Sequence, residues 1–221
     1  MYLLAYVAFT LIAIGVGLLI VHELGGVREL DDRVARWLGR NRTDTLDTMT
    51  WLGSGSAEAV VKIGVTLVAS VVFIWRWRRW SEPALLAGVL VLEVMVFVTS
   101  SLVVDRDRPP VSQLDSVPLT SSYPSGHTAA AVAFYGAIAI IVFWHTRNRF
   151  ARGLALTAAI LLPPIVGVSR MYRGMHHLSD VIVGAIVGLA SLGVVYAVVR
   201  PRWRESMTET EGTRDSRADR H

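Results

Sequence analysis

Long uncharged apolar stretches dominate the pattern of hydrophobic and polar positions along this chain. Four of them contain no Asp, Glu, Lys or Arg, namely Met1 to Val21, His127 to Trp144, Gly153 to Ser169 and Val181 to Val199. A helix rises about 1.5 Å per residue, so roughly 20 apolar residues cross the hydrocarbon core of a bilayer. The pattern therefore predicts an all-α integral membrane protein.

The polar segments between these stretches divide the chain into six predicted transmembrane helices. They run over residues 3–22, 57–76, 83–104, 127–146, 152–169 and 177–199. We interpret the first as a retained span rather than a signal peptide, because it has no basic n-region and no small-residue cleavage site follows it. Residues 1–200 form one predicted membrane domain, and the polar residues 201–221 a disordered tail.

The two longest connections between spans are residues 23–56 and 105–126. The first contains apolar residues at the spacing of one helix face, namely Val27, Leu30, Val34, Trp37 and Leu38. Arg and Asp residues lie between them. This pattern favours an amphipathic helix on the membrane surface over a soluble domain.

Composition and charge narrow the class of protein. The chain has no cysteine, which excludes disulfides, thiolate metal sites and cysteine nucleophiles. Its net charge of +4 comes from arginines beside the spans, so attraction to anionic lipid headgroups explains the charge better than nucleic acid does. Membrane lipids are therefore the expected partners.

The distribution of arginine predicts the orientation in the membrane. Clusters lie at residues 75–80, 147–152 and 200–204, and all three fall on one face of a six-span bundle. Excess basic residues mark the cytoplasmic face. Both termini are then cytoplasmic, and the loops 23–56, 105–126 and 170–176 lie outside the cytoplasmic membrane.

Residues suited to phosphate chemistry gather in these outer loops. They are Asp105-Arg106-Asp107-Arg108-Pro109, then Pro124-Ser125-Gly126-His127, and finally Ser169-Arg170 followed by His176 and Asp180. Two spans separate the loops, so both return to the same face. Arginine binds phosphate oxygens with a planar pair of donors, and a helix N-terminus favours an anion.

The two histidines and the aspartate indicate phosphoryl transfer through a phosphohistidine. His176 and Asp180 are four residues apart, so at the start of a helix they share a face. An aspartate that accepts from one ring nitrogen fixes the tautomer and leaves the other nitrogen to attack. His127 can then protonate a leaving alkoxide. This arrangement requires no metal and no other cofactor.

With these motifs the chain resembles the type 2 phosphatidic acid phosphatases (PAP2), membrane relatives of the vanadium haloperoxidases and bacterial acid phosphatases. The family signatures are Lys-x6-Arg-Pro, Pro-Ser-Gly-His and Ser-Arg-x5-His-x3-Asp. The second and third are present without change, at residues 124–127 and 169–180. In the first, Arg108-Pro109 is present but Ser101 stands where the family has Lys. The resemblance covers roughly residues 1–200.

The resemblance implies roles for the site residues. His176 would be the nucleophile, Asp180 its orienting partner and His127 the general acid. The phosphate would be bound by Arg108, Arg170, Ser125 and the backbone of Gly126. Arg106 either supplies the charge of the missing lysine or is a solvated loop residue.

Other ionisable residues have simpler interpretations. His176 and His177 could suggest a metal pair, but adjacent residues point apart on a helix, so we predict no metal site. Arg173 is expected to face water rather than substrate. Glu93 and Lys62 lie inside spans, where a structural polar contact between them, or between Lys62 and Glu58, is favoured over catalysis.

The expected function is that of a membrane phosphatase acting on a lipid phosphate or diphosphate. Polyprenyl (undecaprenyl or decaprenyl) diphosphate is the first substrate that the resemblance suggests, followed by phosphatidate and phosphatidylglycerophosphate. Two alternatives remain open. One is a lipid phosphotransferase with the same intermediate, and the other is a non-catalytic lipid-binding scaffold, motivated by Ser101. The sequence predicts no nucleic-acid partner and leaves the oligomeric state open.

Overall fold

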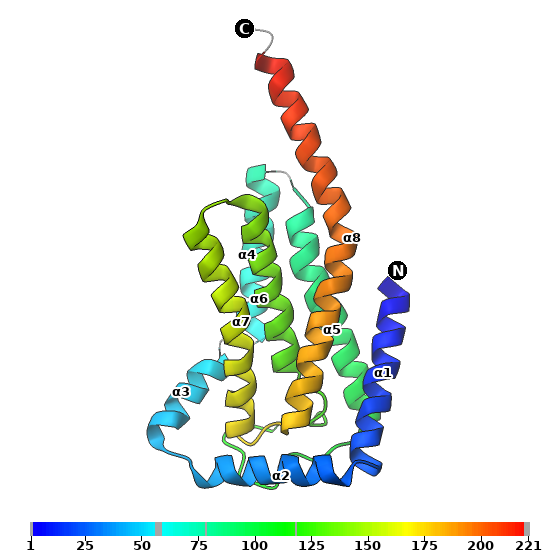
Figure 1. The fold of residues 1–221 in the computed structure, drawn as a ribbon, viewed down its shortest axis with the longest axis vertical. Coiled ribbons are helices and arrows are strands. Elements are labelled where there is room, and N and C mark those ends of the chain that lie inside the picture. Colours follow the sequence, from blue (N-terminus) through cyan, green and yellow to red (C-terminus); the bar gives the residue numbers. More distant parts are fainter. Residues whose placement is uncertain (1, 56–58, 78, 118, 219–221) are drawn as a thin grey trace.

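A computed structural model describes residues 2–55, 59–77, 79–117 and 119–218, and within them the chain forms eight helices (Figure 1). In chain order they are α1 (Tyr2–His22), α2 (Gly25–Arg40), α3 (Asp44–Gly55), α4 (Ala59–Trp77), α5 (Ser81–Val103), α6 (Gly126–His145), α7 (Arg149–Tyr172) and α8 (Leu178–Ala218). The prediction of an all-α bundle is confirmed.

Five helices in the described residues are long and apolar enough to cross a membrane. They are α1, α5, α6, α7 and the segment Leu178–Trp203 of α8. The sixth predicted span, 57–76, corresponds to α4, whose described apolar stretch Gly64–Trp75 is shorter. Glu58 and the side chain of Lys62 lie outside the described part of the chain, and so do the predicted contacts of Lys62.

The segment after α1 forms two helices that cover one end of the bundle. The predicted amphipathic helix is α2, which lies across this end in Figure 1. The sequence interpretation did not include α3. Its start carries an N-terminal signal, because the Oγ1 of Thr43 accepts from the backbone N–H of Leu46 at 3.3 Å and Asp44 and Asp47 lie in the first turn.

Small residues let α6 and α8 approach closely, and this contact builds the site. A Cβ on Gly184 would overlap the carbonyl of Ser125, and one on Gly188 the carbonyl of Ala129. Such close backbone contact is typical of small residues between membrane helices. It also lets the Ser125 N–H donate to the Asp180 carbonyl at 3.0 Å, which joins the two unchanged motifs.

Helix boundaries extend beyond the predicted spans. Asn148 caps α7, since its side chain accepts from the N–H groups of Phe150 and Ala151 at 2.8 and 3.3 Å. The helix then continues through Pro163 and Pro164 to Tyr172. Where the sequence predicted a disordered tail from residue 201, α8 continues as a helix to Ala218.

Candidate active site

Two connections meet beneath the bundle, at the end that α2 covers in Figure 1. One is the loop between α5 and α6, and the other is the turn of residues 173–177 between α7 and α8. The turn requires Gly174, which has φ of +73° and whose Cβ would lie 2.8 Å from the Ser112 carbonyl oxygen. This turn sets the position of His176.

The ring of His176 is buried and held by a backbone carbonyl. Its Nδ1 lies 2.6 Å from the carbonyl oxygen of Ser122. A carbonyl only accepts, so Nδ1 carries the proton and donates. The lone pair is then on Nε2, the nitrogen that a nucleophilic role requires.

Positive groups surround His176 and keep it neutral. Burial lowers its pKa well below the usual 6.5, and the charges of Arg170, Arg108 and His127 lower it further. The hydrogen bond to Ser122 acts in the opposite direction and is outweighed. The structure therefore brings together four of the predicted site residues, with a neutral imidazole among the cations.

Asp180 is fully buried but has no described hydrogen bond to His176, in contrast to the predicted orienting pair. One of its oxygens, Oδ1, accepts from Arg106. The other, Oδ2, accepts from the backbone N–H of His177 at 2.8 Å. Asp180 thus fixes the backbone next to His176, while the carbonyl of Ser122 orients the ring.

Arg106 forms a buried ion-pair hub instead of supplying the charge of the missing lysine. Its Nη1 donates to Asp180 and, at 2.8 Å, to Ser179 Oγ, and its Nη2 lies 2.7 Å from Asp31 Oδ2. With two carboxylates on one guanidinium, the predicted phosphate-binding role of Arg106 is not what the structure supports. Ser101 is also buried, and its Oγ donates to the Val98 carbonyl at 3.0 Å.

Arg108 has different partners from Arg106. Its Nη1 donates to the Met175 carbonyl at 2.6 Å and its Nη2 to the Thr120 carbonyl at 3.1 Å. These acceptors are neutral, and Arg108 is only partly buried. Its charge therefore remains available to an anion beside His176.

A carboxylate that the sequence did not single out, Asp115, bridges two arginines of α7 and its turn. Arg170 Nη1 donates to Asp115 Oδ2 at 2.8 Å and to Ser54 Oγ at 2.9 Å. Arg173 Nε donates to Asp115 Oδ1 at 2.8 Å. Burial would raise the pKa of Asp115, but the hydrogen bond from Arg173 and the two guanidinium charges lower it overall. The expectation that Arg173 faces water is wrong, because it is buried in this ion pair.

The Pro-Ser-Gly-His motif forms the start of α6. Ser125 is the N-cap, and its Oγ accepts from the Thr128 backbone N–H at 3.5 Å. Gly126 packs against the Phe97 ring, which would lie 3.1 Å from an added Cβ. The charge of His127 lowers the pKa of both His176 and Asp115, so His127 belongs to the same cluster of charged side chains. The positive end of α6 faces the same region.

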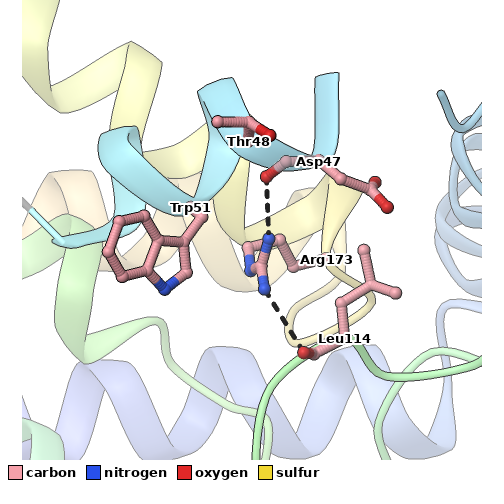
Figure 2. Close-up of a pocket in the computed structure, with 5 residues that line it drawn as sticks. All are labelled: Asp47, Thr48, Trp51, Leu114 and Arg173. Atoms are coloured by element: carbon pink, nitrogen blue, oxygen red, sulfur yellow. Dashed lines mark hydrogen bonds between the residues drawn. The ribbon is translucent and has the colours of Figure 1, made fainter. Parts of the chain in front are cut away.

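A pocket of about 320 Å³ lies on the α3 side of the Asp115 ion pair (Figure 2). It is lined by Asp47, Thr48, Trp51, Leu114 and Arg173. The guanidinium of Arg173 crosses it, with Nη1 donating to the Asp47 carbonyl at 3.2 Å and Nη2 to the Leu114 carbonyl at 3.3 Å. In the described part of the chain, no three His, Asp or Glu side chains gather as a metal site.

A sequence model of the PAP2 superfamily matches residues 82–204, which is more than half of the chain. The chain belongs to the PAP2 superfamily. It is a multi-pass membrane protein of this family of lipid phosphatases.

Curated relatives and solved structures agree with this family. The chain is 27% identical to phosphatidylglycerophosphatase B of Bacillus subtilis (strain 168) over 156 residues, which is 65% of this chain and 70% of that protein. It is 27% identical to human sphingosine-1-phosphate phosphatase 2 over 136 residues, 58% of this chain but 32% of that protein.

The fold resembles those of two solved structures. The transmembrane PAP2-type phosphatidylglycerolphosphate phosphatase from Bacillus subtilis superposes with a TM-score of 0.76 at 20% identity, over 91% of this chain and 98% of that one. Aquifex aeolicus LpxE superposes with a TM-score of 0.58 at 20% identity, over 75% of this chain and 93% of that one.

Proposed function

We propose that this PAP2 protein hydrolyses a lipid phosphate or diphosphate through a phosphohistidine on His176, without a metal ion. The observation that carries the proposal is the hydrogen bond from His176 Nδ1 to the Ser122 carbonyl. It leaves a lone pair on Nε2, next to the charges of Arg108 and Arg170. A neutral nucleophile beside two guanidiniums suits attack on a phosphate, whose charge they compensate.

In the first half-reaction, the Nε2 lone pair attacks the phosphorus. The N–P bond forms while the bond from phosphorus to the lipid oxygen breaks. His127 donates a proton to that oxygen, so a lipid alcohol leaves from a monophosphate and a lipid monophosphate leaves from a diphosphate. Arg108 and Arg170 bind the phosphoryl oxygens, and Arg170 exchanges part of its bond to Asp115 for the phosphate.

In the second half-reaction, water replaces the departed lipid. His127 now accepts a proton from the water, whose oxygen attacks the phosphorus. The N–P bond breaks, the electron pair returns to Nε2, and inorganic phosphate leaves. His176 is then neutral and ready for the next substrate.

The substrate is a lipid that reaches the site from the membrane. The exposed side chain of Trp51 lines the pocket of Figure 2, and Met49 and Leu52 of the same helix α3 are also exposed, so this helix suits contact with acyl chains. Polyprenyl diphosphate remains our first substrate. The names of the relatives add weight to phosphatidylglycerophosphate and to lipid monophosphates in general.

We place the site on the extracytoplasmic face. The start of α1 and the far end of α8 point away from the site in Figure 1, and the arginine clusters lie at their end of the bundle. A reporter that is active only after export, fused after His221, tests this orientation. The reporter should be inactive. Activity would show that the C-terminus lies on the extracytoplasmic face and that the predicted orientation is wrong.

Phosphate release in detergent tests the reaction. Polyprenyl diphosphate, phosphatidate and phosphatidylglycerophosphate are compared with EDTA present, for wild type, His176→Ala and the matched control His22→Ala at an exposed position of α1. We expect release that survives EDTA and is lost in His176→Ala alone. Turnover that depends on a lipid acceptor and frees little phosphate would indicate a phosphotransferase. No turnover of any substrate would favour the scaffold.

A further inference from the structure

The surface helix α2 carries a buried acid, Asp31, whose contacts reach the residues around His176. Asp31 is 1% exposed, whereas the side chain of its neighbour Asp32 is 38% exposed and pairs with Arg36 one turn away. A carboxylate is removed from water at a high cost unless charged or polar partners compensate it. The partners of Asp31 therefore indicate what its burial achieves.

Those partners lie far away in the sequence and belong to the site. Asp31 Oδ2 accepts from Arg106 Nη2 at 2.7 Å and from Ser179 Oγ at 2.5 Å, and Oδ1 accepts from the Ser179 backbone N–H at 3.0 Å. Asp31 thereby connects α2 to the α5–α6 loop and to the first turn of α8. Each of its two oxygens has a donor.

Arg106 links Asp31 to the backbone on one side of His176 and to the hydrogen-bond acceptor of its ring on the other. Its guanidinium binds Asp180, whose Oδ2 holds the backbone N–H of His177. Its carbonyl oxygen accepts from the backbone N–H of Ser122 at 3.0 Å. Ser122 is the residue whose carbonyl orients the His176 ring. One arginine thus fixes the turn that carries the nucleophile and the acceptor that sets its tautomer.

We propose that Asp31 is a positioning residue of the phosphatase centre, which holds Arg106 and through it the geometry of His176. This inference rests on the proposed phosphatase function. Asp31 has no described bond to the phosphate-binding guanidiniums of Arg108 and Arg170. Its loss should therefore slow the chemical step and leave substrate binding largely intact.

The test compares Asp31→Asn with Asp32→Asn, which removes the same charge one residue away on the exposed face. Steady-state phosphate release is measured with the best substrate of the wild type. We expect Asp31→Asn to lower kcat by about 10–100-fold with KM changed less than about threefold, because small displacements of a reacting group have effects of this size. Asp32→Asn should match wild type, and Asp31→Glu should recover part of kcat.

Two outcomes would overturn the inference. One is a kcat for Asp31→Asn equal to that of Asp32→Asn, and the other is a loss expressed in KM alone. If Asp31→Asn does not fold, Ser179→Ala serves instead, since it removes one hydroxyl between Asp31 and Arg106 and leaves every charge in place. It should lower kcat several-fold at constant KM, and wild-type kcat would contradict the proposal. A wild type inactive on every lipid phosphate would instead refute the proposed function.

Discussion

Arg106 and Arg108 lie two residues apart in one loop and have opposite surroundings. Arg106 is 8% exposed and lies between the carboxylates of Asp31 and Asp180. Arg108 is partly exposed, and its described hydrogen bonds go to the carbonyls of Met175 and Thr120. The first guanidinium therefore bonds directly to two carboxylates, whereas the second has no described bond to a carboxylate and only feels the charge of Asp180 from a distance.

The loop sequence Asp105-Arg106-Asp107-Arg108-Pro109 does not tell which arginine stabilises the fold and which can bind phosphate, but the different partners of the two arginines do. A guanidinium between two buried carboxylates stabilises the fold, because it compensates charges that would otherwise be buried alone. A guanidinium on neutral carbonyls can still attract a phosphate dianion. In the proposed mechanism, the side of the cluster with Asp31, Arg106 and Asp180 thus builds the site, and the side with Arg108 and His176 carries out the reaction.

The largest expected effect, apart from loss of the nucleophile, is on the reacting side. His127→Ala should lower kcat by about 10²–10⁴-fold on a lipid phosphate, because the leaving alkoxide then lacks its proton donor. In the first turnover, release of p-nitrophenolate from p-nitrophenyl phosphate, whose leaving group needs no proton, should fall much less than release of the lipid alcohol. Equal losses of leaving-group release in the first turnover would contradict the assignment of His127 as general acid.

Alanine substitutions at Arg106 and Arg108 test the difference between the two arginines directly. Arg108→Ala should lower kcat/KM by about 10²–10³-fold with an unchanged melting temperature, because it removes a charged donor to the phosphate. Arg106→Ala should destabilise the protein by about 3–5 kcal/mol, since two buried carboxylates lose their partner. Kinetics and thermal unfolding in the same detergent measure both. The account fails if the two variants exchange these phenotypes.

The pH profile sharpens the account of the reacting side. His176 attacks only when neutral, and burial together with nearby guanidiniums holds its pKa well below 6.5. The acidic limb of kcat/KM should therefore lie below pH 6.5. Removing a positive charge, as in Arg108→Gln, raises the pKa of His176 and should move this limb to higher pH in the residual activity. An acidic limb above pH 6.5 in wild type would contradict a neutral, buried nucleophile.

The smallest effect is expected at Glu93, which belongs to neither side of the charged cluster. Glu93 is buried within α5, and we interpret it as a structural polar contact. Glu93→Gln keeps the shape and the hydrogen-bonding capacity of the side chain, so kcat should stay within about threefold of wild type. Normal folding with lost turnover would instead make Glu93 part of the reaction.

The sequence was sufficient where a feature depends on local spacing. Apolar stretches of span length predicted the all-α bundle. The unchanged motifs predicted that His127, His176 and Arg170 lie close together. The boundaries were less accurate, because caps such as Asn148 extend helices beyond their apolar stretches. The helix α3 was missed, since a helix of 12 residues whose apolar side chains are only weakly segregated to one face gives a weak periodic signal.

Long-range contacts were not accessible in this way. The partners of Asp31 are 75 and 148 residues away, and the acceptor of His176 is a backbone carbonyl, which no side-chain motif records. One signal was present for Asp31. It lies four residues after Val27 and three before Val34, so an acid interrupts the apolar face of α2. Asp115 carried no such signal in its loop.

Direct detection of the phosphohistidine tests the central claim. Wild type and His176→Ala are mixed with lipid phosphate that carries a radiolabel on phosphorus, then quenched in alkali and digested for peptide mapping. We expect a label that is stable in alkali, lost in acid and located on His176, and we expect it to be absent from His176→Ala. Wild-type turnover with no labelled histidine, or a label that persists in His176→Ala, would contradict the account.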